Sequence, residues 1–168
     1  MKAYLSPKAQ KLFVENNIFI KRELEARYEI KHEIYLKKLQ IESRVLGDMA
    51  LNHIIPTAIS YQNTLISNVQ GLKEILPDVY AEISEVQLKA IKAIAVHIRE
   101  IRTLVDEMTT ARKVANNTIL EEVKRAEAYA ETVLLYLDRI RDHIDHLELL
   151  VDDEIWPLPK YRELLFTK

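Results

Sequence analysis

Apolar residues recur at alternating steps of three and four along the last third of the chain. We call this set the seam, and its members are Ile119, Val123, Ala126, Ala130, Val133, Leu137, Ile140, Ile144, Leu147 and Val151. Such spacing lines one face of an α-helix and is typical of helices that pack on other helices. It predicts a long helix over residues 118–153, opened by a capping box at Thr118 and Glu121.

Further helical patterns precede the seam. They predict a helix over residues 84–115, with a capping box at Ser84 and Gln87, and a longer one over 21–75. A short helix over 6–16 is expected because Ser6 is a good N-cap and a proline follows it at the first helical position. No strand pattern competes with these elements. The chain is therefore predicted to be all-α: an antiparallel bundle of three long helices in one domain over 1–168, with a folded-back tail over 154–168.

Pro56 lies inside the longest predicted helix and is expected to kink it, because proline lacks the N–H that bonds the carbonyl four residues earlier. The polar residues beside it either face a ligand or serve the freed backbone. We favour the second interpretation, in which Asn52 or His53 satisfies a carbonyl that Pro56 leaves free. A count of 3.5 residues from Tyr28 and His32 also places His53 on the apolar stripe, which predicts a buried position.

Composition narrows the possible functions. Two glycines in 168 residues leave no glycine-rich loop for a nucleotide phosphate. The net charge of −2, from 24 basic and 26 acidic residues, offers no basic excess for nucleic acid. Cysteine is absent, no apolar run approaches the roughly 20 residues of a membrane span, and the N-terminal residues lack the apolar core of a signal peptide. A cytoplasmic protein that contacts neither nucleic acid nor membrane is expected.

Carboxylate and histidine spacing suggests one enzymatic alternative. Glu29 and His32 form a Glu-x-x-His pair, which is half of the motif that di-metal helical bundles repeat on two helices. The second half is missing, since His143 and His146 lie in a charged stretch that reads as a solvated helix face. We therefore predict no catalytic, cofactor-binding or metal-binding residue. A ferritin-like metal bundle and a stand-alone coiled-coil adaptor stay open as alternatives.

Three segments carry a family resemblance that spans nearly the whole chain, and the first, "SPKAQKLFVENNIF" (6–19), resembles the part just before the region that the second matches. "ELEARYEIKHEIYLKKLQIESRVLGDMALNHIIPTAISYQNTLISNVQGLKEI" (23–75) resembles the C-terminal region of type III glutamine synthetase, the long-chain bacterial form, and "WPLPKYRELLF" (156–166) resembles that family's C-terminus. The resemblance implies an upstream catalytic half, absent here, that holds the glutamate, ATP, ammonium and divalent-metal sites. Met1 would then begin an excised piece or a separate gene product, and the chain itself would be no enzyme and hold no cofactor.

The same resemblance implies a structural role, in which the chain packs on the catalytic half or on neighbouring subunits and supports oligomer assembly. Self-association is also possible through the seam. We expect the contacts in two regions, the kink and the tail. The candidate residues are Asn52, His53, Pro56, Tyr61, Gln62, Trp156, Tyr161, Leu164 and Phe166. For the tail, packing on the chain's own helices is the competing interpretation.

Overall fold

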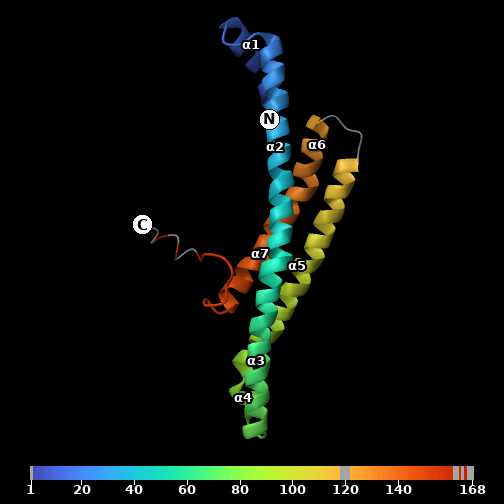
Figure 1. The fold of residues 1–168 in the computed structure, drawn as a ribbon. Helices are drawn as coiled ribbons and strands as arrows, with labels where there is room; N and C mark the ends of the chain where they lie inside the picture. The colour runs from blue at the N-terminus through green and yellow to red at the C-terminus, as the bar shows by residue number, and fades with distance from the viewer. Residues whose placement is uncertain (1, 118–121, 161–162, 164, 166–168) are drawn as a thin grey trace. The chain divides into compact units, whose positions relative to one another are not determined.

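The computed structural model describes residues 2–117, 122–160, 163 and 165, and Figure 1 traces them. In chain order the elements are η1 (Lys2–Leu5), α1 (Pro7–Glu15), α2 (Lys21–Met49), η2 (Ala50–Ile54), α3 (Ile55–Ile75), α4 (Tyr80–Ile83), α5 (Glu85–Asn117), α6 (Glu122–Ala128), η3 (Tyr129–Val133) and α7 (Leu134–Leu150). η1 is a 3-10 helix, whereas η2 and η3 are π-helical turns. No strand occurs among the described residues, and the all-α prediction is confirmed.

The start of α1 follows the sequence prediction. The Ser6 hydroxyl accepts the backbone N–H of Ala9 at 3.3 Å, and Pro7 occupies the first helical position. The helix ends in a sharp reversal at Asn17, which adopts φ 52°. Asparagine tolerates this left-handed conformation better than most residues, because its short polar side chain bonds locally. The reversal turns the chain from α1 into α2.

A π-helical turn, η2, interrupts the long helix just before Pro56. The backbone N–H of Ile55 donates to the carbonyl of Ala50, five residues earlier, and the chain then continues as α3. The hydroxyl of Thr57 donates to the carbonyl of His53 at 2.9 Å. The expectation that Asn52 serves a freed carbonyl is therefore wrong, because its amide donates instead to the Asp48 carboxylate at 2.5 Å. A shifted bonding pattern and a threonine hydroxyl accommodate the proline.

Gly71 lies inside α3, which continues to Ile75. A Cβ added there would meet no atom within 4 Å, and φ is not positive. Gly71→Ala should therefore raise the free energy of unfolding by about 0.5–1 kcal/mol, since alanine loses less backbone freedom on entering a helix. Urea unfolding followed by circular dichroism measures the difference. A lower stability in the variant would contradict the open surroundings of this residue.

The predicted capping box at Ser84 is wrong. Ser84 is the C-cap of the short helix α4, and its hydroxyl donates to the carbonyl of Tyr80 at 2.5 Å. Gln87 turns away from it and donates to the side chain of Asn68 at 3.3 Å. Ser84 is buried, so the hydroxyl satisfies a carbonyl of the preceding turn. The second predicted box, Thr118 to Glu121, lies outside the described residues.

The chain divides into two compact units, each of which has its own buried residues. Unit 1 comprises 1–44 and 108–135, and unit 2 comprises 45–107 and 136–168. In unit 1 the buried residues come from α2, the end of α5, α6 and η3: Leu24, His32, Leu36, Leu39, Ser43, Met108, Ala115, Ala126, Tyr129 and Val133. Asn116 joins two of these elements through one atom, since its Oδ1 accepts the amide of Gln40 at 3.2 Å and the hydroxyl of Tyr129 at 2.9 Å.

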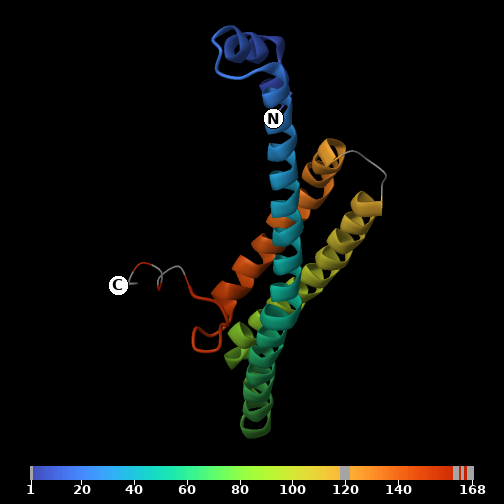
Figure 2. The ribbon, with the colours of Figure 1, turned by 45° about the horizontal axis from the view of Figure 1, so that its top comes forward.

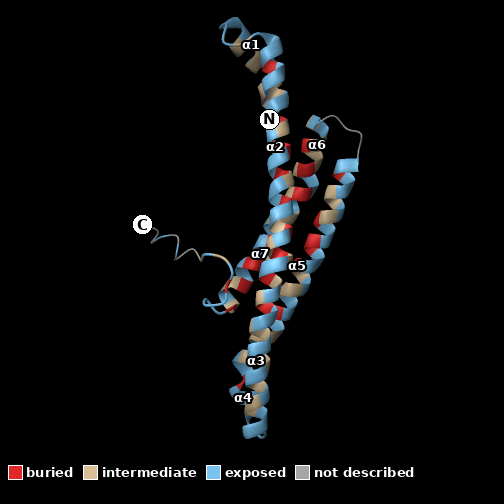
Figure 3. Cartoon of the chain, viewed as in Figure 1, coloured by how far each residue is buried: buried red, intermediate tan, exposed pale blue. Residues whose placement is uncertain are grey.

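In unit 2, α3 and the first part of α5 lie side by side in opposite directions, joined through α4 (Figure 2). Gln62 donates to the carbonyl of Ile91 at 2.8 Å, and Gln87 reaches back to Asn68, as an antiparallel pair requires. The buried residues of this unit, red in Figure 3, include Ile54, Ala58, Ile94, Ile101, Leu104, Val105, Ile140, Ile144, Leu147, Val151 and Trp156. The described members of the seam are all buried or half-buried, and Ile119 lies outside the described residues.

Candidate functional site

The structure separates the predicted residues near Pro56 into two groups. Asn52, His53 and Pro56 are exposed, whereas Tyr61 and Gln62 are half-buried. The expectation of a buried His53 is wrong, because the buried positions here are Ala50, Ile54 and Ala58. In the exposed group, the Asn52 amide donates to the carboxylate of Asp48, one turn earlier on the same helix.

The described part of the tail packs within unit 2. Trp156 is only 8% exposed, and the Lys160 ammonium donates to the carbonyl of Glu148 at 2.9 Å and to the carboxylate of Asp153. These contacts tie the residues after α7 to the end of that helix. Tyr161, Leu164 and Phe166, the other predicted tail residues, lie outside the described residues.

The Glu-x-x-His pair does not converge into a site. His32 is buried, and its Nδ1 lies 2.9 Å from the carbonyl of Tyr28. Glu29 is exposed. Within the described ranges, no three histidine or carboxylate side chains come together as a group able to hold a metal ion. In the same ranges, no helix has the length and apolarity needed to cross a membrane.

A histidine cluster that sequence reasoning missed lies between α5 and α7 in unit 2. The Nδ1 atoms of His97 and His143 are 3.0 Å apart, and the ring of His146 stacks on His97 with centroids 5.0 Å apart. A hydrogen bond between two imidazole nitrogens needs one donor and one acceptor, so this pair cannot carry a proton on both atoms. Burial lowers the pKa of His97, as do the neighbouring His143 and His146, while Asp142 opposes the shift.

The cluster predicts that stability falls in mild acid. Because the pKa of His97 in the folded protein lies below its ordinary value of 6.5, the unfolded chain binds more protons as the pH drops. The stabilisation is complete above pH 6.5, and it is lost as the pH falls through 6.5 toward the pKa of His97 in the folded protein. Urea unfolding at pH 7.5, 6 and 5 should show a shallower decline for His97→Asn. The exposed His53→Asn is the control, and equal declines in both variants would contradict the assignment to His97.

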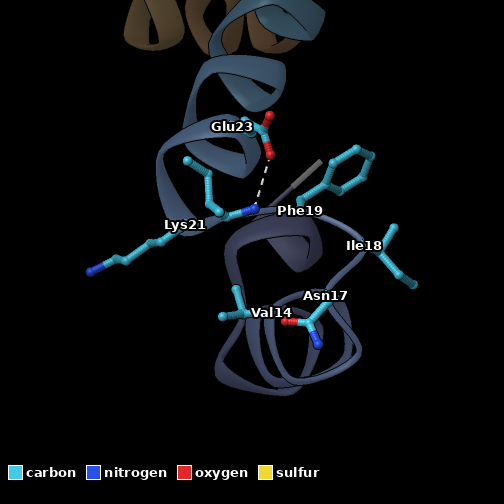
Figure 4. A pocket seen from close by; sticks show the side chains of 7 residues that line it. Val14, Asn17, Ile18, Phe19, Lys21 and Glu23 are labelled. Atoms are coloured by element: carbon cyan, nitrogen blue, oxygen red, sulfur yellow. Dashed lines mark hydrogen bonds between the residues drawn. The ribbon is translucent and has the colours of Figure 1, made fainter.

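An apolar hollow of about 260 Å³ lies in unit 1 where α1 turns into α2 (Figure 4). Val14, Asn17, Ile18, Phe19, Ile20, Lys21 and Glu23 line it. Glu23, in the first turn of α2, accepts the backbone N–H of Ile20 at 2.9 Å, as the acid of a capping box does. The carboxylate is therefore engaged by the chain itself, and the exposed apolar side chains of Ile18 and Ile20 form the open part of the hollow.

Aromatic rings pack against one another beside the hollow. Phe13 packs against Phe19 with centroids 5.6 Å apart and against Tyr4 at 5.9 Å. The guanidinium of Arg27 lies 4.4 Å from the Phe19 ring centroid, and the ammonium of Lys31 lies 4.3 Å from that of Tyr4. Cations over ring faces are held by the ring quadrupole. The hollow is therefore an apolar recess with two positive side chains beside it.

Comparison with known proteins relates the chain to glutamine synthetases. Residues 1–73 match the family described as glutamine synthetase C-terminal domain. The chain is 52% identical over 167 residues to a glutamine synthetase of Bacteroides fragilis (strain YCH46), an alignment that covers 98% of this chain and 23% of the relative. It is 30% identical over 173 residues to the type-3 glutamine synthetase of Dictyostelium discoideum, covering 97% of this chain and 22% of that protein.

The described residues form an all-helical fold in which no group of three histidine or carboxylate side chains could hold a metal ion. The sequence of the chain corresponds to the C-terminal region of glutamine synthetases, by the family match over residues 1–73 and by the alignments over nearly the whole chain. It spans less than a quarter of the length of the relatives it matches, including a glutamine synthetase of Butyrivibrio fibrisolvens, which is 26% identical over 167 residues and 23% covered. The predicted resemblance is confirmed.

Proposed function

We propose that this chain is a non-catalytic helical domain that packs on the catalytic part, or on neighbouring subunits, of a glutamine synthetase and supports assembly of the oligomer. The observation that carries the proposal is the 52% identity over nearly the whole chain to one region of a glutamine synthetase. The partner would ligate ammonia to glutamate with ATP and a divalent metal, and would hold both cofactors. We also propose that the chain acts in the cytoplasm together with that partner.

The exposed residues beside Pro56 remain candidates for this packing. Asn52, His53 and Pro56 present side chains to solvent on one stretch of helix. Gln62 is less suited, because its amide already donates to the carbonyl of Ile91 within unit 2. Trp156 is likewise covered by its own unit, so a tail contact would need other residues.

Removal of the corresponding region from the Bacteroides fragilis relative tests the proposal. The shortened enzyme is expected to form a smaller particle or to lose glutamine-forming activity, because packing contacts between subunits would be missing. Light scattering gives the particle mass, and a coupled ATPase assay gives the activity. Restoration of both by adding the 168-residue chain in trans would strengthen the case. A shortened enzyme with unchanged mass and unchanged kinetics would refute the proposed role.

A further inference from the structure

The α2 helix carries a second apolar face that the chain leaves uncovered. Ile30, Ile34 and Ile41 are 52%, 51% and 62% exposed, and we call them the isoleucine face. Each lies two residues before a buried position of unit 1: His32, Leu36 and Ser43. Two residues correspond to about 200° around an α-helix, so the isoleucine face points directly away from the core. A helix that needs only one partner has one apolar stripe.

The isoleucine face lies on the helix that begins beside the apolar hollow. Ile20, which lines the hollow and is also exposed, precedes Ile34 and Ile41 by two and three heptads. Ile34 and Ile41 are seven residues apart on α2 and so differ by only about 20° around it, whereas Ile20 directly precedes the helix. From Ile30 to Ile41 the isoleucine face is about 17 Å long at 1.5 Å per residue, and the charged residues Glu23 and Arg27 lie between it and Ile20. Figure 3 shows the pale blue, exposed side of α2 along this length. A straight, narrow apolar surface of this length fits a helix.

The charges beside the isoleucine face are mainly positive. Arg27, Lys31 and Lys38 are exposed, and Lys37 on the same side pairs with Glu33 at 2.5 Å. Glu23, the other acid on this side, accepts the N–H of Ile20. Both acids are therefore engaged within α2, and the surplus is positive.

These charges disfavour a second copy of α2 as the occupant. A parallel pair would bring Arg27 against Arg27 and Lys37 against Lys37. An antiparallel pair that sets Ile30 against Ile34 would bring Arg27 beside Lys37. Like charges placed directly opposite one another destabilise a helix pair.

We infer that the isoleucine face docks an amphipathic helix of the glutamine synthetase catalytic part or of a neighbouring subunit, with apolar residues at steps of three and four and acidic residues beside them. One apolar side chain of that helix enters the hollow next to Phe19. Its carboxylates meet Lys31 and Lys38, while its apolar stripe covers Ile30, Ile34 and Ile41. This inference rests on the proposed function and adds the surface and the chemistry of the partner.

The probe is the Bacteroides fragilis glutamine synthetase shortened by the region that corresponds to this chain. Its affinity for the full 168-residue chain is measured by titration calorimetry, and its association rate by surface-immobilised binding. Ile30→Ser combined with Ile34→Ser should weaken binding at least tenfold. Lys31→Glu combined with Lys38→Glu should slow association several-fold and reduce its salt dependence, because peripheral charges act mainly on encounter. Leu149→Ser on α7, where the leucine is 86% exposed, and Lys124→Glu on α6 are the matched controls.

Each outcome separates this inference from the proposed function. Binding by the unaltered chain that survives both face variants would overturn the docking surface and leave the proposed function standing. Absence of binding by the unaltered chain would overturn both. Self-association of the chain alone that Ile30→Ser and Ile34→Ser abolish would identify a second copy as the occupant and overturn the partner assigned here. If the chain adsorbs to phosphatidylglycerol vesicles and the same variants abolish this adsorption, the isoleucine face binds a membrane. That result would also overturn the partner assigned here.

Discussion

Trp156→Ala should lower the free energy of unfolding by about 3–5 kcal/mol, the usual cost of deleting a large buried aromatic side chain. The indole is 8% exposed, and Lys160 fastens the same segment to the carbonyl of Glu148. Urea unfolding should show the loss of stability when it is followed by circular dichroism of the helices, a signal that does not depend on the tryptophan. Leu149→Ala, which alters an 86% exposed leucine nearby, should change stability by less than about 0.5 kcal/mol.

A second substitution at Trp156 isolates its polar atom. The indole Nε1 is buried and has no hydrogen-bond acceptor among the described residues. Trp156→Phe removes this unsatisfied N–H together with some apolar contact, so it should cost much less than Trp156→Ala. Equal losses in the two variants would show that the N–H does find an acceptor. Removal of residues 155–168 with no loss of stability would contradict packing of the tail on its own unit altogether.

Tyr129→Ala should destabilise unit 1 by a comparable amount, about 3–5 kcal/mol. Tyr129 has no exposed surface, and its hydroxyl donates to Asn116, which also accepts from Gln40. Tyr129→Phe removes only the hydroxyl and should cost about 1 kcal/mol, the typical net contribution of one hydrogen bond. Amide hydrogen exchange reports each unit separately and can locate the loss.

The control for this position is Leu135→Ala on α7, because the leucine is 61% exposed. It should leave protection in α2 and α6 unchanged. If Tyr129→Phe cost as much as Tyr129→Ala, the hydroxyl rather than the packed ring would be the main source of stability. If neither variant changed exchange in unit 1, the aromatic ring would not be part of its core.

Local signals in the sequence predicted the helices well. Ser6 and Pro7 mark the start of α1 because each acts on its own backbone. The apolar steps of the seam and the shortage of glycine likewise act locally, and they predicted the all-α class. The capping box at Ser84 was predicted wrongly because a serine hydroxyl can either cap the start of a helix or bond to the carbonyl of a preceding turn. Only the backbone path decides between these two bonds.

The burial of His53 was predicted wrongly because the count of 3.5 residues from Tyr28 had already left the buried side of α2 well before η2: Leu36 and Ser43 are buried there, rather than Tyr35 and Glu42. A fixed count from Tyr28 assigns His53 to the core, whereas the buried residue is the next one, Ile54. An error of one residue is about 100° of rotation, enough to move a side chain from core to solvent. Neither η2 nor η3 could be predicted, since the shift from α to π bonding requires no particular residue type.

The candidate surfaces depended on long-range packing and were harder to foresee. His97 meets His143 and His146 from a different helix, and nothing in the spacing of either helix indicates the match. The isoleucine face had a signal, because Ile30, Ile34 and Ile41 follow one another at steps of four and seven residues. A second apolar stripe in one helix could have been noticed before its exposure was known. Which stripe faces the core depends on the partner helices and follows only from the structure.

The two π-helical turns also indicate where the length of this chain can change in evolution. A π turn of the kind at Ala50–Ile54 or Tyr129–Val133 accommodates one residue more than the α-helix on either side requires. Loss of that residue restores ordinary α bonding and leaves the faces before and after in phase. Elsewhere in these helices a single deletion would rotate everything beyond it by about 100°. These turns are therefore the places where related chains can differ by one codon and keep the same core.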